Sequence, residues 1–461
     1  MISATSFVGL IGLLPVALSA ATTGTFDALT FNVAGLPAFL NGNDVPGDKT
    51  ENTARIGQLF AQYVTDIIHV QEDFNYHATL YANDDHPYRT ATSGGVPFGD
   101  GLNTLSNFDW VDFERTKWST CSDASSSDCL TPKGFTFMRA KISEGVWADF
   151  YNLHADAGTE TADNAARAAN LKQVSDHIKT YSDGNSVLVF GDTNSRYTRS
   201  DDVPRIFSTE NGMTDAWVQL AKGGVAPAAG SDALLCDNPS PNTTCEIVDK
   251  LWYRGSPSLT LAATKFQYAG SQYLQTNGSV LSDHDPVLVD FKWTVSNKLR
   301  ISDPYGGPHG DFYNDISTVS HEHMLEIALS LMQHVDKQLS GVSSPTAASI
   351  TLRGASRLDA VSLTLSSGQT FTHGGTGGTA STLKLNSGES FTSATICQGT
   401  YNSETRVFYM QVTTSLGRTV AAGTKNSDCV TRTVESGWGI VGFTGRSGDE
   451  VDRVALIYGK L

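Results

Sequence analysis

The stretch SDHDP at residues 282–286 runs directly into VLVDF at residues 287–291. The second run alternates apolar side chains and predicts a β-strand, so two acids and an imidazole stand at the mouth of that strand. A carboxylate and a histidine in this position can bind a metal ion and face negative charge that develops in a reaction. Asp-His-Asp is also common in surface loops, so the functional interpretation depends on the rest of the chain.

Five earlier runs of sequence predict strands that carry a polar side chain at or near one end. They are the runs 26–33, 66–73, 147–153, 186–190 and 245–253. With 282–286 they present Asn32, Glu72, His154, Asp192 with Asn194, Asp249, and Asp283 with His284. Each residue alone has an ordinary explanation, such as an Asx turn, a helix N-terminal acid or a buried histidine. Because strand ends of a packed sheet converge in space, we expect the set to form one site.

Two helices are predicted between these strands. Residues 51–63 place four large side chains on one face, namely Ile56, Leu59, Phe60 and Tyr63. Residues 161–180 place small and apolar side chains inward, and Thr161 is expected to cap that helix. Strands and helices together indicate an α+β domain.

Six segments in this order resemble the endonuclease/exonuclease/phosphatase superfamily. They are FNVAGLP at 31–37, VQED at 70–73, NLHAD at 152–156, VFGDTN at 189–194, VDKLWY at 248–253 and SDHDP at 282–286. The resemblance covers roughly residues 25–295. It implies a four-layer α/β sandwich in which two packed, mainly antiparallel sheets are flanked by helices. It also implies hydrolysis of a phosphoester by water, in which charge stabilisation and positioning do most of the work.

The resemblance also implies a metal site. Glu72 is the expected principal ligand of Mg²⁺, with Asn32 beside it and Asp283 completing the site; Mn²⁺ is the alternative ion. Mg²⁺ takes oxygen ligands and keeps several waters, so one or two carboxylates are enough to hold it.

The remaining residues take catalytic roles by the same resemblance. Asp192 is the expected base that aligns and deprotonates the attacking water, and Asn194 and His154 are expected to hold phosphate oxygens. His284, kept protonated by Asp249, is expected to stabilise the pentacoordinate phosphorus. Thr193 stands where an apolar residue is more usual in the family, a departure expected to affect packing rather than chemistry.

The charge of the chain bears on the substrate. The net charge is −16, and residues 1–300, with 34 acids and 21 bases, account for −13 of it. Nucleic-acid-binding proteins usually present a basic face. We therefore expect a non-nucleic phosphoester, namely a phospholipid headgroup or inositol-phosphate ester. An endonuclease, and an inactive scaffold for a lectin, remain as alternatives.

The N-terminus and the cysteines predict export. Residues 1–20 contain an apolar core of about a dozen residues and end in small residues, as a secretory signal peptide does. The catalytic domain is then expected over residues 22–297, with no transmembrane segment. Six cysteines allow 15 pairings, and spacing favours Cys121–Cys129, Cys236–Cys245 and Cys397–Cys429. Sequons at Asn242 and Asn277 predict glycosylation on this route.

Residues 298–461 differ in composition: Gly, Ser and Thr dominate and short strands alternate with turns. Their motifs resemble the jacalin-related lectins, which implies an all-β β-prism that binds glycans, most simply of the mannose type. By the resemblance, sugar would bind between two loops whose residues are Gly306, Gly307, Gly448, Asp449, Glu450 and Asp452. A β-prism with a degenerate sugar site is the alternative.

Residues 319–338 are an unusual insertion in this domain. Apolar side chains at helical spacing predict an amphipathic helix in an otherwise all-β region. A second reading is a retained intron, because Val319-Ser320 can be encoded by a splice-donor sequence and Gln338 by a terminal CAG. Sequencing the transcript distinguishes the two readings.

Overall fold

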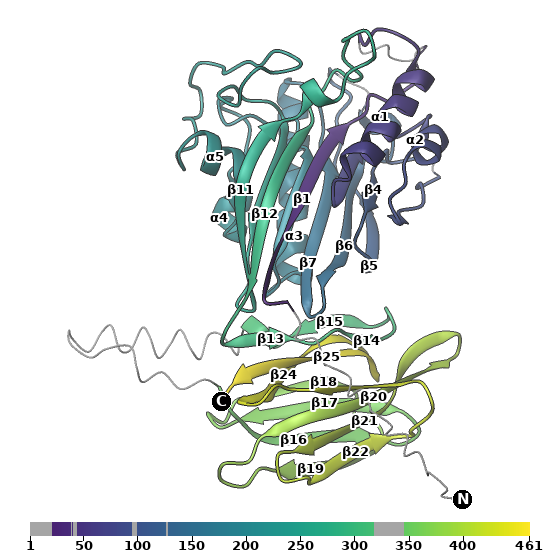
Figure 1. Ribbon diagram of the computed structural model, residues 1–461, viewed down its shortest axis with the longest axis vertical. Coiled ribbons are helices and arrows are strands. Elements are labelled where there is room, and N and C mark those ends of the chain that lie inside the picture. Colours follow the sequence, from purple (N-terminus) through teal and green to yellow (C-terminus); the bar gives the residue numbers. More distant parts are fainter. Residues whose placement is uncertain (1–20, 38, 40–43, 95–98, 126–127, 318–344) are drawn as a thin grey trace, which may run out of the picture.

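Figure 1 shows the computed structural model as two bodies stacked end to end, a larger α/β body and a smaller all-β body. The structure describes residues 21–37, 39, 44–94, 99–125, 128–317 and 345–461. The predictions for residues 1–20 and 319–338 therefore lie outside the described residues. Among the described residues, no helix combines the length and the apolar character needed to cross a bilayer.

Two six-stranded sheets form the α/β body. The first has the order β11 (Leu259–Tyr268), β12 (Val287–Val295), β1 (Thr23–Asn32), β2 (Ile67–Gln71), β4 (Asn103–Ser106) and β3 (Tyr88–Arg89). The second has the order β5 (Trp110–Lys117), β6 (Gly134–Ser143), β7 (Val146–His154), β8 (Val187–Asp192), β10 (Asp249–Arg254) and β9 (Thr214–Asp215). The β1–β2 and β7–β8 pairs are parallel, and the other pairs are antiparallel.

In the described part of the chain, four helices lie on the outer faces of the sheets, and a fifth, α5 (Ala216–Ala221), packs at the edge of the apolar cluster between them. The other four are α1 (Lys49–Tyr63), α2 (His77–Asn83), α3 (Thr161–Tyr181) and α4 (Ile206–Asn211), with short 3₁₀ turns at η1 (Asp128–Leu130) and η2 (Gly270–Gln272). Side chains of α1 pack on β1 and β2, and side chains of α3 pack on β7 and β8. A third apolar cluster, which includes Phe26, Phe150, Phe190 and Phe291, lies between the sheets. The predicted four-layer sandwich is confirmed.

Several element ends differ from the prediction by a few residues, and two of them have a clear physical reason. Helix α3 is capped by Glu160, whose side chain forms a capping box with Asp163, so the prediction of Thr161 as the cap was wrong. Both acids satisfy backbone N–H groups of the first turn and favour the positive end of the helix dipole. Strand β10 begins only at Asp249, because the preceding residues 245–248 form the end of a disulfide-closed loop.

Three disulfides confirm the predicted pairs Cys121–Cys129, Cys236–Cys245 and Cys397–Cys429. The first two close loops at the end of the sandwich that carries the candidate site. The third joins paired residues of neighbouring strands in the all-β body.

Three sheets form the all-β body, which matches the predicted β-prism. The first holds β13 (Leu299–Ile301), β14 (Tyr305–Gly306), β15 (Asp311–Asn314), β24 (Trp438–Ser447) and β25 (Val451–Lys460). The second holds β16 (Ala347–Gly354), β17 (Leu358–Leu365), β18 (Thr370–Gly374) and β19 (Thr379–Lys384). The third holds β20 (Phe391–Tyr401), β21 (Glu404–Thr414), β22 (Thr419–Gly423) and β23 (Cys429–Thr433). One apolar cluster fills the space between the three sheets.

The all-β body packs on the end of the sandwich opposite to the predicted catalytic residues (Figure 1). It contacts the β6–β7 turn at Gly145 and the start of β8 near Asn185. The carboxyl ends of β1, β2, β7 and β8 point the other way, so this body does not cover them.

Gly191 gives a stability prediction. It lies in β8 next to β7, where an added Cβ would clash with backbone atoms of Leu153, which cannot move without breaking the sheet. Gly191→Ala is expected to lower the free energy of unfolding by about 1–3 kcal/mol, as overpacking does. Calorimetry should show a lower melting temperature for the α/β body. Gly448→Ala, where a Cβ meets nothing within 4 Å, is the control, and an equal effect in both variants would contradict this reading.

Candidate active site

The predicted strand-end residues meet at one end of the sandwich, between the two sheets. Asn32 ends β1 and His284 precedes β12 in the first sheet, while Asp192 ends β8 and Asp249 begins β10 in the second. Asp192 and Asp249 are direct partners in the β8–β10 register, which places both carboxylates at the same level. The convergence expected from the sequence is therefore present.

Asp192 lies at the centre of the site. Its Oδ2 accepts a hydrogen bond from Asn32 Nδ2 at 3.1 Å and lies 3.4 Å from His154 Nε2 and 3.8 Å from His284 Nε2. Its Oδ1 accepts from the backbone N–H of Asn194 at 2.9 Å. Burial alone would raise the pKa of Asp192, but the nearby histidines and these hydrogen bonds outweigh it and lower the pKa. The group is therefore an ionised carboxylate inside the protein.

His284 and Asp249 form a buried ion pair beside it. The distance from His284 Nδ1 to Asp249 Oδ2 is 2.7 Å. Burial opposes protonation of the ring, but the charges of Asp249 and Asp192 outweigh it and raise the pKa of His284 well above its usual value. The imidazolium thus points its Nε2 toward Asp192 and Asn32 while Asp249 holds the other nitrogen.

His154 is neutral, and its predicted role of holding a phosphate oxygen stays a prediction. Burial, followed by the charge of Lys133, lowers its pKa to about 3. Lys133 Nζ lies 3.1 Å from His154 Nε2, so the lysine donates and the ring nitrogen accepts. Lys133 is also ion-paired with Asp128, whose other oxygen accepts from the Ala157 N–H at 3.0 Å. The positive group that contacts His154 on this side of the site is therefore Lys133.

The sequence interpretation gave Lys133 no role. The Lys133-Gly134 pair opens β6, and a lysine ahead of an apolar strand carries no catalytic signal by itself. Its place in the site depends on the loop closed by the Cys121–Cys129 disulfide, which ends in the η1 turn that holds Asp128. Only the three-dimensional structure joins these two residues to His154.

Glu72 has the surroundings expected of a metal ligand. It follows β2 in a left-handed conformation with φ 56°, and its Oε1 accepts from Asn32 Nδ2 at 3.2 Å. Its other oxygen is buried without a hydrogen-bond partner among the described residues. Burial raises the pKa of Glu72, and the charges of Lys133 and His284 act against that rise. A cation at the unpartnered oxygen would compensate the buried charge, so the donor set fits Mg²⁺ or Mn²⁺.

The surroundings of Asn32 and Asp283, the two other predicted metal ligands, match a ligand role less closely than those of Glu72. Asn32 turns its amide nitrogen toward Glu72 and Asp192, and its oxygen accepts from the Ala34 N–H at 3.1 Å; ligation through oxygen requires the amide to be flipped. Asp283 is exposed and accepts from the Ser282 hydroxyl at 3.4 Å. Asn194 lies beside Asp192 with φ 50°, and its amide donates to the Ala155 carbonyl at 3.1 Å. The ligand and phosphate roles of these residues stay predictions.

The glycines of the predicted sugar loops are required by backbone packing. Gly306 has φ 125°, and a Cβ there would clash with the Asp452 carbonyl, while a Cβ at Gly307 would clash with the Thr405 carbonyl. Both glycines therefore let β14 pack against β25 and the β20–β21 hairpin. This packing accounts for them whether or not sugar binds.

The acids of the predicted sugar loops fall into two groups. Asp449 is exposed beside Gly448 at the β24–β25 turn. Glu450 accepts from Arg357 Nε at 2.6 Å, and Asp452 is fully buried with one oxygen ion-paired to Arg406. The other oxygen of Asp452 has no hydrogen-bond partner among the described residues. A hydroxyl donor from a sugar would satisfy it, but sugar binding stays a prediction.

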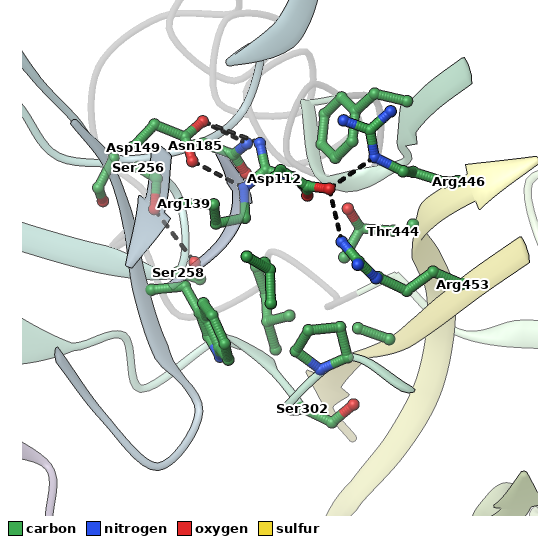
Figure 2. Close-up of a pocket in the computed structure, with 18 residues that line it drawn as sticks. Asp112, Arg139, Asp149, Asn185, Ser256, Ser258, Ser302, Thr444, Arg446 and Arg453 are labelled. Atoms are coloured by element: carbon green, nitrogen blue, oxygen red, sulfur yellow. Dashed lines mark hydrogen bonds and ion pairs between the residues drawn. The ribbon is translucent and has the colours of Figure 1, made fainter. Parts of the chain in front are cut away.

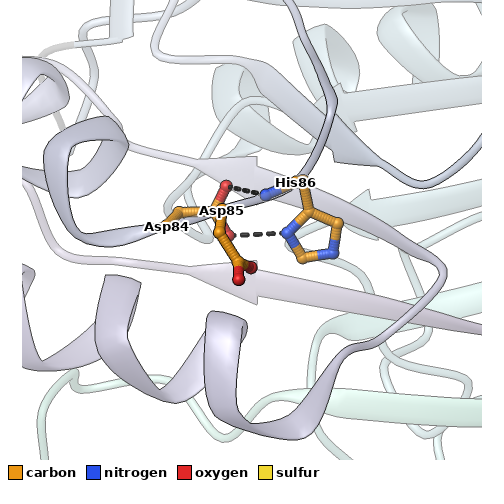
Figure 3. Close-up of side chains that lie close together, drawn as sticks. All are labelled: Asp84, Asp85 and His86. Carbon is orange, nitrogen blue, oxygen red and sulfur yellow. Dashed lines mark hydrogen bonds and ion pairs between the residues drawn. The ribbon is translucent and has the colours of Figure 1, made fainter.

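Asp84, Asp85 and His86 form a second cluster with metal-ligand side chains (Figure 3). Both ring nitrogens of His86 are already used: Nδ1 lies 2.6 Å from Asp84 Oδ1 and Nε2 lies 2.6 Å from the Thr65 carbonyl. Nε2 must donate to that carbonyl, and Nδ1 can donate to the carboxylate, so the ring is a satisfied imidazolium. We interpret this cluster as a structural ion pair.

Comparison with known families matches both bodies. Residues 50–238 match the family model described as Endonuclease/Exonuclease/phosphatase family 2, and residues 302–457 match the Jacalin-like lectin domain. The sphingomyelinase of Mycobacterium tuberculosis is 36% identical over 282 residues, a match that covers 60% of this chain and 54% of that protein. A sphingomyelinase of Mycobacterium bovis gives the same values. The chain thus spans about half the length of these curated relatives.

Solved structures resemble the two bodies separately. A variant of the beta toxin from Staphylococcus aureus with bound magnesium ions covers 58% of this chain and 99% of its own, with 17% identity and a TM-score of 0.41. A mannose binding jacalin related lectin from Ananas comosus covers 35% of this chain and 99% of its own, with 21% identity and a TM-score of 0.26.

His86 gives a prediction about pH and stability. Burial alone would lower its pKa, but its hydrogen bonds to Asp84 and Thr65 outweigh burial and raise it. Because the folded pKa lies above the unfolded one, the stabilisation is complete below pH about 6.5 and is lost as pH rises through the raised pKa. We expect His86→Gln to cost about 1–3 kcal/mol of unfolding free energy at pH 5.5.

The cost of His86→Gln in unfolding free energy should be smaller at pH 9, where a smaller fraction of the wild-type rings is protonated. Urea unfolding of both proteins at the two pH values measures it. Asp232→Asn is the control, because Asp232 is an exposed acid that is not among the groups that raise the pKa of His86. An equal cost of His86→Gln at both pH values would contradict the conclusion that His86 is protonated in the folded protein.

Proposed function

Because the chain joins an endonuclease/exonuclease/phosphatase-family domain to a jacalin-like lectin domain, we propose that it is a metal-dependent phosphodiesterase that acts on a phospholipid headgroup. Sphingomyelin is the first substrate to test, since the curated relatives are sphingomyelinases. The observation that carries the proposal is the buried Asp192 carboxylate, which lies 3.8 Å from His284 Nε2 and accepts from Asn32 Nδ2 at 3.1 Å, with Lys133 held against the neighbouring His154. That arrangement suits a base next to a phosphate that gains negative charge.

Each residue of the site has a separate role in the proposed hydrolysis. Asp192 Oδ2 orients the attacking water and takes its proton as the new oxygen–phosphorus bond forms. The bond from phosphorus to the ester oxygen then breaks, and the leaving alkoxide takes up a proton from solvent. His284, held as imidazolium by Asp249, faces the charge that develops on the pentacoordinate phosphorus. Lys133 and Asn194 lie where they can hold the non-bridging oxygens, with His154 keeping Lys133 in place.

A divalent ion completes the site. Glu72 would hold it, with Asn32 in its flipped orientation and Asp283 as further oxygen donors. When bound, the ion polarises a phosphoryl oxygen and offsets negative charge on it. Mg²⁺ is the ion we propose, and Mn²⁺ prefers the same kind of oxygen ligand.

The lectin domain would hold the enzyme at a glycosylated surface. Glycan binding raises the local concentration of the catalytic domain near its substrate without a change in the chemistry. A mannose-type glycan is the proposed ligand. We also propose that the protein is exported, which three disulfides support because such bonds persist in oxidising compartments.

Hydrolysis of three substrates side by side tests the function. The purified chain is incubated with sphingomyelin, an inositol polyphosphate and plasmid DNA, each with Mg²⁺ and with EDTA. We expect turnover of sphingomyelin that EDTA abolishes and that Glu72→Gln lowers by about a thousandfold or more. Turnover of DNA alone would establish the endonuclease alternative. Absence of turnover on all three, with a folded protein retained on a mannan column, would support the scaffold alternative.

Asp249→Asn tests the role of the ion pair. The amide keeps a hydrogen-bond partner for His284 but removes the charge that raises its pKa, so the ring becomes neutral near pH 7. We expect kcat on micellar sphingomyelin to fall roughly 10²–10⁴-fold with little change in KM. NMR titration of His284 should show the lowered pKa. Asp290→Asn on β12, away from the site, is the control; a wild-type kcat in Asp249→Asn would refute the role.

A further inference from the structure

A carboxylate of the catalytic domain reaches the lectin domain from an edge strand. In the β5–β6 pair, Val111 lies opposite Arg139 but the next pair is Glu114 with Phe137, so Asp112 belongs to a β-bulge. Asp112 adopts the left-handed conformation with φ 59°. A bulge re-aims the side chains of its strand, and strained backbone of this kind persists only where surrounding contacts hold it.

Two arginines of the lectin domain share that carboxylate (Figure 2). Asp112 Oδ1 accepts from Arg446 Nε at 2.8 Å and from Arg453 Nη1 at 2.7 Å, and the side chain is 2% exposed. Arg139 lies 3.8 Å from the other oxygen but is already paired with Asp149 at 2.7 Å. Asp112 is therefore the counter-charge that lets the two lectin arginines lie side by side.

The same two arginines flank the second predicted sugar loop, residues 448–452, and contact the first, which begins at Gly306. Arg446 Nη1 donates to the Gly310 carbonyl at 3.0 Å, and Arg453 Nε lies 3.5 Å from the Gly306 carbonyl. Arg453 itself follows the buried Asp452, whose carbonyl accepts from the Gly307 N–H at 2.8 Å. Each arginine thus connects the Asp112 carboxylate to the first loop, and each lies close to the second loop in the sequence.

We propose that Asp112 is a positioning residue for the sugar loops, so that the catalytic domain sets the shape of the lectin's ligand site. The proposal builds on the proposed glycan-binding function of those loops. Asp112 would touch no sugar itself. Without its charge, two buried guanidinium groups face each other unpaired, and they separate or take water, which releases the carbonyls of Gly306 and Gly310.

Another interdomain ion pair supplies a matched control. Asp303 of the lectin domain is ion-paired with Lys141 and also accepts from the Gly145 N–H at 2.9 Å and Trp147 Nε1 at 3.0 Å. Lys141 contacts neither Arg446 nor Arg453 through a hydrogen bond or ion pair among the described residues. Lys141→Met therefore weakens docking of the two domains while the braces of the sugar loops stay intact.

Hydrogen exchange of the full chain is the primary test. In Asp112→Ala we expect amides of both loops, Gly307 and Gly448 among them, to exchange roughly tenfold faster or more, whereas Lys141→Met leaves them at wild-type rates. If Asp112→Ala does not fold, Asp112→Asn keeps the shape of the side chain and should shift the same amides in the same direction. Wild-type exchange in a folded Asp112 variant, or equal acceleration in Lys141→Met, would overturn the proposal.

Mannoside binding and sphingomyelin hydrolysis test the positioning role of Asp112 separately from the proposed function. Calorimetry with methyl α-mannoside should show affinity reduced roughly tenfold in Asp112→Asn and unchanged in Lys141→Met. Hydrolysis of micellar sphingomyelin should be equal in all three proteins. If the wild type binds no mannoside while exchange responds to Asp112, the glycan function fails and the positioning role stands. If the wild type binds and the Asp112 variants bind equally, the positioning role fails.

Discussion

The catalytic end of the molecule depends on keeping one buried carboxylate ionised. Asp192 lies inside the protein, where charge is costly unless it is paired. Its compensation comes from both sheets: Asn32 and His284 belong to the first, and the Asn194 N–H, which donates to Asp192 Oδ1, follows β8 of the second. The relative position of the sheets is therefore fixed by electrostatics as well as by apolar packing, and any slip of one sheet would leave Asp192 without its partners.

The family resemblance made the fold predictable, and the pattern of strand ends predicted which residues would meet. Apolar alternation locates β1 and β12, a continuous apolar run locates β8, and a residue at the end of such a strand has a known position once the strands pack. Lys133 escaped prediction because its contact with His154 depends on a loop closed by a disulfide. The cap of α3 escaped because Glu160 and Thr161 both have polar side chains, and only the reciprocal bonds with Asp163 select the glutamate.

The lectin domain shows where a motif has two physical explanations. Gly306 and Gly307 fit the family's sugar loop, but close backbone packing alone would also require them. Asp452 is buried and ion-paired to Arg406, which a sequence motif does not indicate. Its unpartnered oxygen is the feature that distinguishes a ligand site from mere packing, since a buried acceptor without a donor is costly unless a ligand or water satisfies it.

The position of the lectin domain is compatible with the proposed function. Hydrolysis of a phosphoester requires the strand ends that carry Asn32, Glu72 and Asp192 to stay open, and the all-β body lies at the opposite end of the sandwich. There the turns and strand starts offer backbone groups and charges to a partner, and the β5 bulge offers Asp112. A domain docked by buried ion pairs keeps a fixed orientation, unlike one tethered by a flexible linker. Glycan binding would thus define the direction in which the catalytic end faces, and not only its distance from the surface.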